Sequence, residues 1–124
     1  MDIIVSNLDS KPIYEQIYTQ VKQLILAGKL KEGDPLPSIR LLAKELRISV
    51  ITTKRAYEEL ERDGFVMTVQ GKGSFVGHSN PDFIREEHLK HTEELAEKIA
   101  EEAKTAGMSK KELLELIEMV YEQR

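Results

Sequence analysis

Hydroxyl and cationic side chains are concentrated in one short stretch near the middle of this 124-residue chain. Ser49, Thr52 and Thr53 carry hydroxyls, and Lys54 and Arg55 follow them directly. Short hydroxyl side chains can hydrogen-bond to base edges and phosphates, and lysine and arginine are attracted to phosphate charge. We therefore predict that this stretch contacts nucleic acid, provided that it opens a helix and faces outward.

Two short helices joined by a tight turn would position these side chains. Ser38 and Ser49 can each cap a helix, because a serine hydroxyl accepts a hydrogen bond from a backbone amide of the first turn. Gly64 suits the left-handed position just after a helix end. Apolar residues recur at helical spacing in both segments: Ile39, Leu42, Ala43 and Leu46, then Ile51, Ala56, Tyr57 and Leu60. Helices joined this closely cross steeply, as in a helix-turn-helix.

A β-hairpin is predicted directly after the second of these helices. Residues 65–69 and 74–76 are rich in strand-forming side chains, and the turn between them contains Gly71 and Gly73. Lys72 lies between the two glycines, where it can meet a phosphate. A helix-turn-helix followed by such a hairpin is a winged helix.

One more helix is predicted before this motif, opening at Pro12 and ending at Gly28. Its apolar stripe comprises Ile13, Ile17, Val21, Leu24 and Ile25. Residues 3–5 precede it as either a short strand or an arm. The expected fold is mainly α with a small β-hairpin: a winged helix-turn-helix domain over residues 1–77, followed by a two-helix dimerisation segment over residues 78–124.

Five blocks of this sequence together resemble the GntR family of bacterial transcription regulators. They are residues 12–17 (PIYEQI), 33–34 (GD), 36–43 (LPSIRLLA), 56–60 (AYEEL) and 71–76 (GKGSFV). The resemblance covers about residues 12–76, and the short tail resembles that of the YtrA subfamily. It implies a dimeric repressor of double-stranded DNA targets, often one that controls a transporter operon including its own gene.

The helix ends and the resemblance together indicate which residues meet DNA. The candidates are Ser38, Arg40, Ser49, Val50, Ile51, Thr52, Thr53, Lys54, Gly71 and Lys72. The sequence departs from the family pattern at Val50, where arginine is common. Valine can touch a thymine methyl group but cannot make the two hydrogen bonds that arginine makes to guanine. The operator of a relative therefore cannot be transferred to this protein.

The tail is predicted to form two helices after a linker at residues 77–81. Its first helix carries a seam of mostly small residues, and Ser109 with Glu112 forms a capping-box pattern for the second. Each helix has one apolar stripe, which is too little to stabilise a lone hairpin. The predicted contacts with a second copy are Leu89, Thr92, Ala96, Ile99, Ala103, Leu113, Leu116, Ile117 and Val120.

The composition limits the other possibilities. There is no cysteine, which excludes disulfides and thiolate metal sites, and no apolar run approaches the length of a membrane-spanning helix. The start of the chain lacks the basic residues of a signal peptide, so a cytoplasmic protein without membrane contact is expected. The net charge of −4 divides into +1 for residues 1–77 and −5 for residues 78–124. The acidity therefore belongs to the tail and does not argue against a DNA-binding front part.

The remaining alternatives have less support in the sequence. A nucleotide-binding loop needs serine or threonine directly after its lysine, whereas Gly73 follows Lys72. His88 and His91 could share a metal with a nearby glutamate, although a solvated helix face explains them more simply. We expect no enzyme and no cofactor, and the sequence indicates no small-molecule effector. The competing function is a winged-helix adaptor that binds proteins without specific DNA binding.

Overall fold

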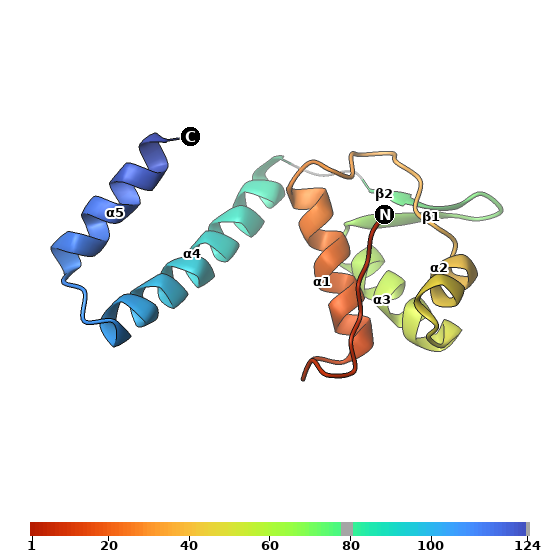
Figure 1. Cartoon of the computed structure of the whole chain (residues 1–124). Coiled ribbons are helices and arrows are strands. Elements are labelled where there is room, and N and C mark those ends of the chain that lie inside the picture. Colours follow the sequence, from red (N-terminus) through yellow and green to blue (C-terminus); the bar gives the residue numbers. More distant parts are fainter. Residues whose placement is uncertain (78–80, 124) are drawn as a thin grey trace. The chain divides into compact units, whose positions relative to one another are not determined.

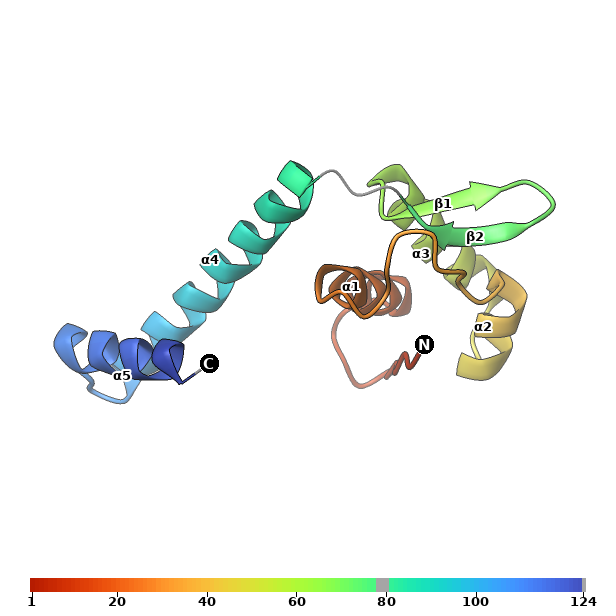
Figure 2. The same ribbon diagram turned by 90° about the horizontal axis from the view of Figure 1, so that it is seen from above.

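The computed structural model describes residues 1–77 and 81–123 (Figures 1 and 2). It contains the elements α1 (Ile13–Leu26), α2 (Ile39–Leu46), α3 (Val50–Arg62), β1 (Val66–Val69), β2 (Gly73–Val76), α4 (Pro81–Thr105) and α5 (Lys110–Glu122). The predicted fold class, mainly α with one hairpin, is confirmed. The chain divides into two compact units, residues 1–84 and 85–124. Residues 78–80 of the predicted linker lie outside the described residues.

The core of the first unit forms where α1 and α2 both pack against α3 (Figure 1). The predicted stripe of α1 is confirmed, with Ile17 and Val21 fully buried and Ile25 nearly so. Leu42 of α2, Leu60 of α3 and Val76 of β2 fill the same core, as the contiguous cluster of buried residues shows. Burying apolar surface stabilises a fold by about 25 cal/mol per Å². This cluster is therefore the main source of the first unit's stability.

Residues 3–6 form an arm that two glutamines of α1 hold in place. Gln20 accepts a hydrogen bond from the Ile4 amide (2.9 Å) and donates one to the Ile4 carbonyl (2.6 Å). Gln16 does the same for Ser6, with both distances 2.9 Å. Each side-chain amide thus takes the place of a neighbouring strand, since it offers one donor and one acceptor. Of the two alternatives from the sequence, the arm is confirmed.

The hairpin is antiparallel, and the chain before α2 adds to its outer edge. The register pairs Val66 with Val76 and Val69 with Gly73. The Leu36 amide donates to the Ser74 carbonyl (2.9 Å), and the Val76 amide donates to the Asp34 carbonyl (2.8 Å). These bonds hold the segment that leads into α2 against the β-hairpin, which is the wing.

Aromatic contacts bring the first turn of α4 into the first unit. The ring of Phe83 lies 5.5 Å from that of Phe65, and Tyr18 meets Phe65 edge-on at 6.4 Å. The Tyr18 hydroxyl in turn donates to Asp63 (2.5 Å). The first unit accordingly extends into the start of α4, as far as residue 84.

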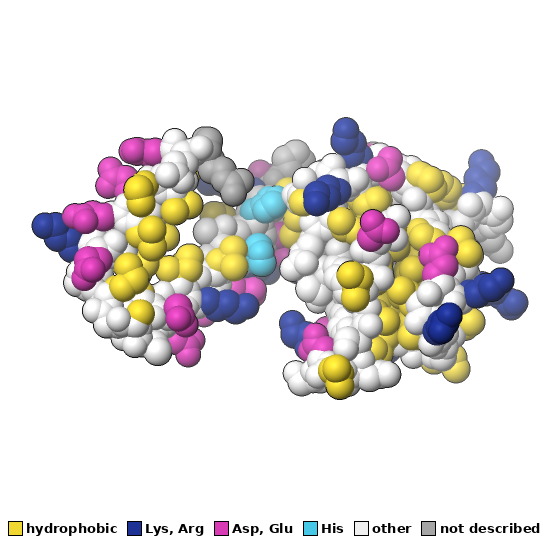
Figure 3. Space-filling view, in the orientation of Figure 1, with side chains coloured by type: hydrophobic (Ala, Val, Ile, Leu, Met, Phe, Trp, Pro, Cys, Tyr) yellow, Lys and Arg dark blue, Asp and Glu magenta, His cyan; other side chains and the backbone are white. Residues whose placement is uncertain are grey.

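In the second unit, the predicted break and restart of the helix are confirmed. Gly107 adopts a left-handed conformation after α4, and Ser109 and Glu112 form both bonds of the capping box at α5. Within α5, all of which the structure describes, no side chain is buried. Leu116 and Ile117 are each 40% exposed and Val120 is 48% exposed. Figure 3 shows hydrophobic side chains gathered over this unit.

Most of the predicted partner contacts on α4 are also uncovered. Leu89 and Ile99 are 47% and 40% exposed, and Thr92 and Ala96 are exposed as well. The Thr92 hydroxyl donates to the His88 carbonyl of its own helix (2.7 Å). Ala103 is the exception, because it is buried already in the single chain, at 6% exposed. Leu113 is half-buried.

Two further findings concern membranes and metals. None of the helices in the described ranges is both long and apolar enough to cross a membrane. Among residues 1–77 and 81–123, no three histidine, aspartate or glutamate side chains are grouped so that they could hold a metal ion. His91 instead lies 3.9 Å from Glu94, at the spacing of a weak surface pair.

Candidate nucleic-acid interface

The turn between α2 and α3 is built by backbone geometry and one serine cap. Arg47 ends α2 in the left-handed conformation (φ 57°), and the Ile48 amide donates back to the Ala43 carbonyl (3.0 Å). Ser49 then caps α3, accepting from the Thr52 amide (3.0 Å). The turn is therefore only three residues long, which forces the steep crossing expected of a helix-turn-helix.

A buried tyrosine holds α3 against the start of α2. The Tyr57 hydroxyl donates to the Pro37 carbonyl at 2.7 Å, and the side chain is 3% exposed. Burial, with a smaller contribution from the negative charge of Glu45, raises the pKa of Tyr57 well above its ordinary value of 10.0. The phenol thus stays protonated and keeps its hydrogen bond throughout the neutral range.

The two faces of α3 divide differently from the prediction. The buried face consists of Thr53, Ala56, Tyr57 and Leu60, at helical spacing. The prediction that Thr53 contacts DNA is wrong, because its side chain is fully buried and its hydroxyl donates to the Ser49 carbonyl (3.1 Å). Ile51, which the apolar spacing would place on the core face although it is also a DNA-contact candidate, is 81% exposed.

The first two turns of α3 therefore present a mixed surface of apolar, hydroxyl and cationic groups. Val50 is 47% exposed beside Ile51, and Lys54 is exposed one turn later. The Ser49 hydroxyl donates to the Thr52 hydroxyl (2.7 Å) while accepting the Thr52 amide, so Ser49 acts chiefly as a cap. The Thr52 hydroxyl can still donate its proton to an acceptor outside the protein.

Charge is distributed unevenly along α3. Lys54 and Arg55 lie in its first half, and each pairs with a glutamate one turn later: Glu58 at 3.7 Å and Glu59 at 3.8 Å. The Arg55 guanidinium also stacks over the Tyr14 ring of α1, 3.7 Å from its centroid. The second half of the helix is consequently acidic, and the positive end of the helix dipole is at the other end. An anionic partner is favoured only at the first turns.

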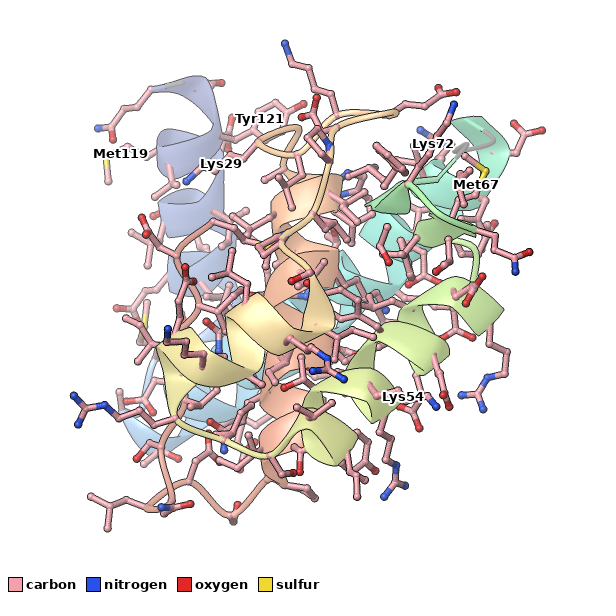
Figure 4. All side chains as sticks on the ribbon, turned by 90° about the vertical axis from the view of Figure 1, so that its right-hand side faces the viewer. Lys29, Lys54, Met67, Lys72, Met119 and Tyr121 are labelled. Carbon is pink, nitrogen blue, oxygen red and sulfur yellow. The ribbon has the colours of Figure 1, made fainter. Side chains whose placement is uncertain are left out.

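Two other elements carry the remaining candidates. Ser38 caps α2 by accepting from the Leu41 amide (3.1 Å), which leaves Arg40 exposed in the first turn of α2. At the wing tip Gly71 adopts φ 79°, and the Lys72 amide closes the turn on the Val69 carbonyl (2.9 Å). Figure 4 shows Lys72 at the wing tip and Lys54 on α3, both on the outside of this unit.

Arg47 is a candidate that the sequence did not reveal. It is exposed, it belongs to the turn itself, and its left-handed conformation is the only one among the described residues other than glycine. Glycine usually occupies such a position, so an arginine there does not indicate from the sequence that the helix ends. The short spacing between Leu46 and Ser49 is the one signal from which this conformation could have been inferred.

A capped second helix whose first turn faces outward, next to a hairpin with a lysine at its tip, defines a winged helix-turn-helix of the DNA-binding regulators. The sequence profile described as "Bacterial regulatory proteins, gntR family" matches residues 13–76. This chain belongs to the GntR family, and it is a transcriptional regulator with a DNA-binding winged helix.

Full-length relatives agree with this assignment. The HTH-type transcriptional repressor YtrA of Bacillus subtilis (strain 168) is 36% identical over 111 residues, 90% of this chain and 85% of that protein. A GntR family transcriptional regulator from Listeria monocytogenes has 32% identity and a TM-score of 0.72, covering 90% of this chain and 96% of that one. YtrA from Sulfolobus acidocaldarius, a GntR-family transcription factor, has 34% identity and a TM-score of 0.59, with 98% and 97% covered.

Proposed function

We propose that this protein is a homodimeric repressor that binds a palindromic operator upstream of an operon containing its own gene. The observation that carries this proposal is the first two turns of α3, where Val50, Ile51 and Lys54 are exposed while the opposite face is anchored in the core. The name of the YtrA relative, a transcriptional repressor, supports the direction of regulation. The resemblance supports a transporter operon as the target.

Different residues of the interface have different tasks in this proposal. Val50, Ile51 and Thr52 face base edges in the major groove, because the N-terminal residues of a recognition helix enter there. Lys72 on the wing and Arg40 on α2 contact the phosphate backbone, and Arg40 can also turn to a guanine. Arg47 joins them as a further phosphate contact, since it is exposed directly before the recognition helix.

The tail provides the dimer contact. Leu89, Ile99, Leu116, Ile117 and Val120 are all at least 40% exposed in the single chain. So many exposed large apolar side chains on two neighbouring helices are typical of an interaction surface. Packing against a second copy would cover them. Two DNA-binding units held together in this way require half-sites about 10 bp apart, or a multiple of that distance.

The proposal is tested by electrophoretic shift with the upstream region of the gene and a matched duplex of random sequence. Lys72→Ala should weaken binding to both duplexes equally and reduce the slope of log K against log salt by about 1 per monomer. Thr52→Ala should leave that slope nearly unchanged and cost about 1–3 kcal/mol on the operator alone.

The adaptor hypothesis predicts a different result. Nonspecific DNA binding by a regulator lies near 10⁻⁴–10⁻⁶ M, so a regulator at about 10 μM should retard DNA at low salt. The absence of any retarded band under those conditions would favour the adaptor. Equal loss of operator and random-DNA binding by Thr52→Ala would refute the assignment of Thr52 as a base contact.

A further inference from the structure

The most exposed large apolar side chain of α3 is an isoleucine at its second residue. Ile51 is 81% exposed, and it precedes the buried Thr53 by two positions, which places it about 200° around the helix from that residue. Val50 beside it is 47% exposed. Both are branched at Cβ and therefore stiff, so they present fixed methyl groups at the end of the helix.

The groups around this apolar pair favour DNA over a protein as its partner. Lys54 follows one turn later, and Arg47 precedes the helix; both are exposed. The positive end of the helix dipole adds to their charge. A partner that covers Val50 and Ile51 must therefore present negative charge on either side of an apolar patch. The major groove of DNA does so where it contains thymine, whose 5-methyl group is the apolar feature of the groove and lies between two phosphate chains.

The polar groups nearby contribute little to discrimination between bases. Much of that discrimination therefore depends on the methyl groups of Val50 and Ile51. Ser49 uses its hydroxyl as both donor and acceptor toward Thr52, and Thr53 is buried. Thr52 retains one hydroxyl proton, which can be donated to a purine or to thymine alike and so distinguishes bases weakly. The apolar pair is the part of this turn with a unique complement in the groove.

We propose that Val50 and Ile51 read the 5-methyl groups of thymine in each half-site of the operator. This inference rests on the proposed function and adds the chemistry by which it selects its sequence. Burial of one methyl group contributes about 0.8 kcal/mol, which corresponds to about a four-fold change in affinity. Two half-sites that each lose one methyl contact should together lose about fifteen-fold.

The test begins with a library of duplexes of random sequence, from which the full-length protein selects its preferred sites. The selected sequence is then made twice, once with thymine and once with uracil at the half-site positions, so that only the methyl groups differ. We expect the uracil duplex to bind about four-fold to fifteen-fold more weakly. Equal affinity for the two duplexes, or selected half-sites without thymine, would overturn the inference and leave the regulator function intact.

Variants identify the residues that are responsible. Ile51→Ser and Val50→Ser should reduce the difference between thymine and uracil duplexes, because serine has no methyl group to contact the thymine methyl. Ile4→Ser is the matched control, since Ile4 is 78% exposed on the N-terminal arm; it should keep the full difference. If both α3 variants keep it too, other residues read the methyl groups and the inference is wrong. If the library yields no enriched sequence, the proposed function itself fails.

Discussion

The two units of this chain cover their apolar side chains to very different extents. In residues 1–84 the stripes of α1, α2 and α3 meet in one core, where Ile17, Val21 and Leu60 are fully buried. In residues 85–124 Ala103 is the only buried residue among those described, and the large side chains of α5 remain 40% exposed or more, apart from half-buried Leu113. We therefore expect the first unit to fold alone, and in the proposed dimer the second unit would cover its apolar side chains against a partner surface.

This difference separates two tasks that many regulators combine. The DNA-binding unit needs a rigid recognition helix, and the buried face of α3 with the Tyr57 hydrogen bond provides it. In the proposed dimer the tail needs a surface that a second copy can recognise, and its exposed apolar stripe would provide that surface. Stability and assembly should thus respond to mutations in different parts of the chain.

The largest expected effect comes from removing the tail. A chain ending at Ile84 keeps the Phe83 contact with Phe65 and should remain folded, with cooperative thermal unfolding. It should be monomeric and bind the operator about 10²–10⁴-fold more weakly, because the two half-sites are no longer linked. Sedimentation and operator titration measure both effects. A shortened chain that still sediments as a dimer would place the interface in the first unit.

The next largest effect contrasts one core residue with one tail residue. Leu60→Ala should lower the free energy of unfolding by about 2–5 kcal/mol, because it leaves a cavity in a fully buried site. Ile117→Ala should instead raise the dissociation constant of the dimer, since Ile117 is 40% exposed in one chain. Urea denaturation of the first variant and sedimentation equilibrium of the second measure these changes. An unchanged dissociation constant for Ile117→Ala would remove Ile117 from the dimer interface.

Two glycines give a smaller contrast. A Cβ at Gly77 would lie 2.7 Å from the Gly64 carbonyl oxygen, so Gly77→Ala should force the backbone to shift and cost about 1–3 kcal/mol. A Cβ at Gly107 would meet nothing within 4 Å, and Gly107→Ala should cost only the left-handed conformation, about 1 kcal/mol. Denaturant unfolding of both variants compares them. A larger loss at Gly107 would contradict this ranking.

The smallest effect concerns pH. The folded state keeps Tyr57 protonated, because its pKa is raised, while the unfolded chain ionises near pH 10. The unfolded state therefore binds fewer protons above pH 10, and the stability contributed by Tyr57 is lost as the pH rises through that value. Tyr57→Phe should lower the free energy of unfolding by about 0.5–1.5 kcal/mol at pH 7. Above pH 10 the stability of this variant should decline less steeply than that of the unsubstituted protein. If the free energy of unfolding changes with pH at the same slope in both proteins between pH 9 and 11, the role of this phenol is contradicted.

Much of the fold could be predicted because its signals are local. Ser38, Ser49 and Ser109 cap the helices that the sequence assigned to them, and Gly64 and Gly107 follow helix ends with positive φ. Each of these signals acts within about four residues of chain. The candidate site was located for the same reason, because a cap followed by hydroxyls and cations marks the start of a helix wherever that helix packs.

The sequence by itself determined where α2, α3 and α5 begin, through their serine caps, and where α3 and α4 end, at Gly64 and Gly107. Only the tertiary structure decided that Thr53 faces inward and Ile51 outward, because α1 and α2 choose which side of α3 they cover. Thr53 tolerates that burial since its hydroxyl bonds the Ser49 carbonyl, a compensation invisible to a hydrophobic pattern. The pairing of Leu36 with Ser74 and the glutamine contacts to the arm likewise join distant residues. Interactions across such separations depend on the packed chain, and no local spacing encodes them.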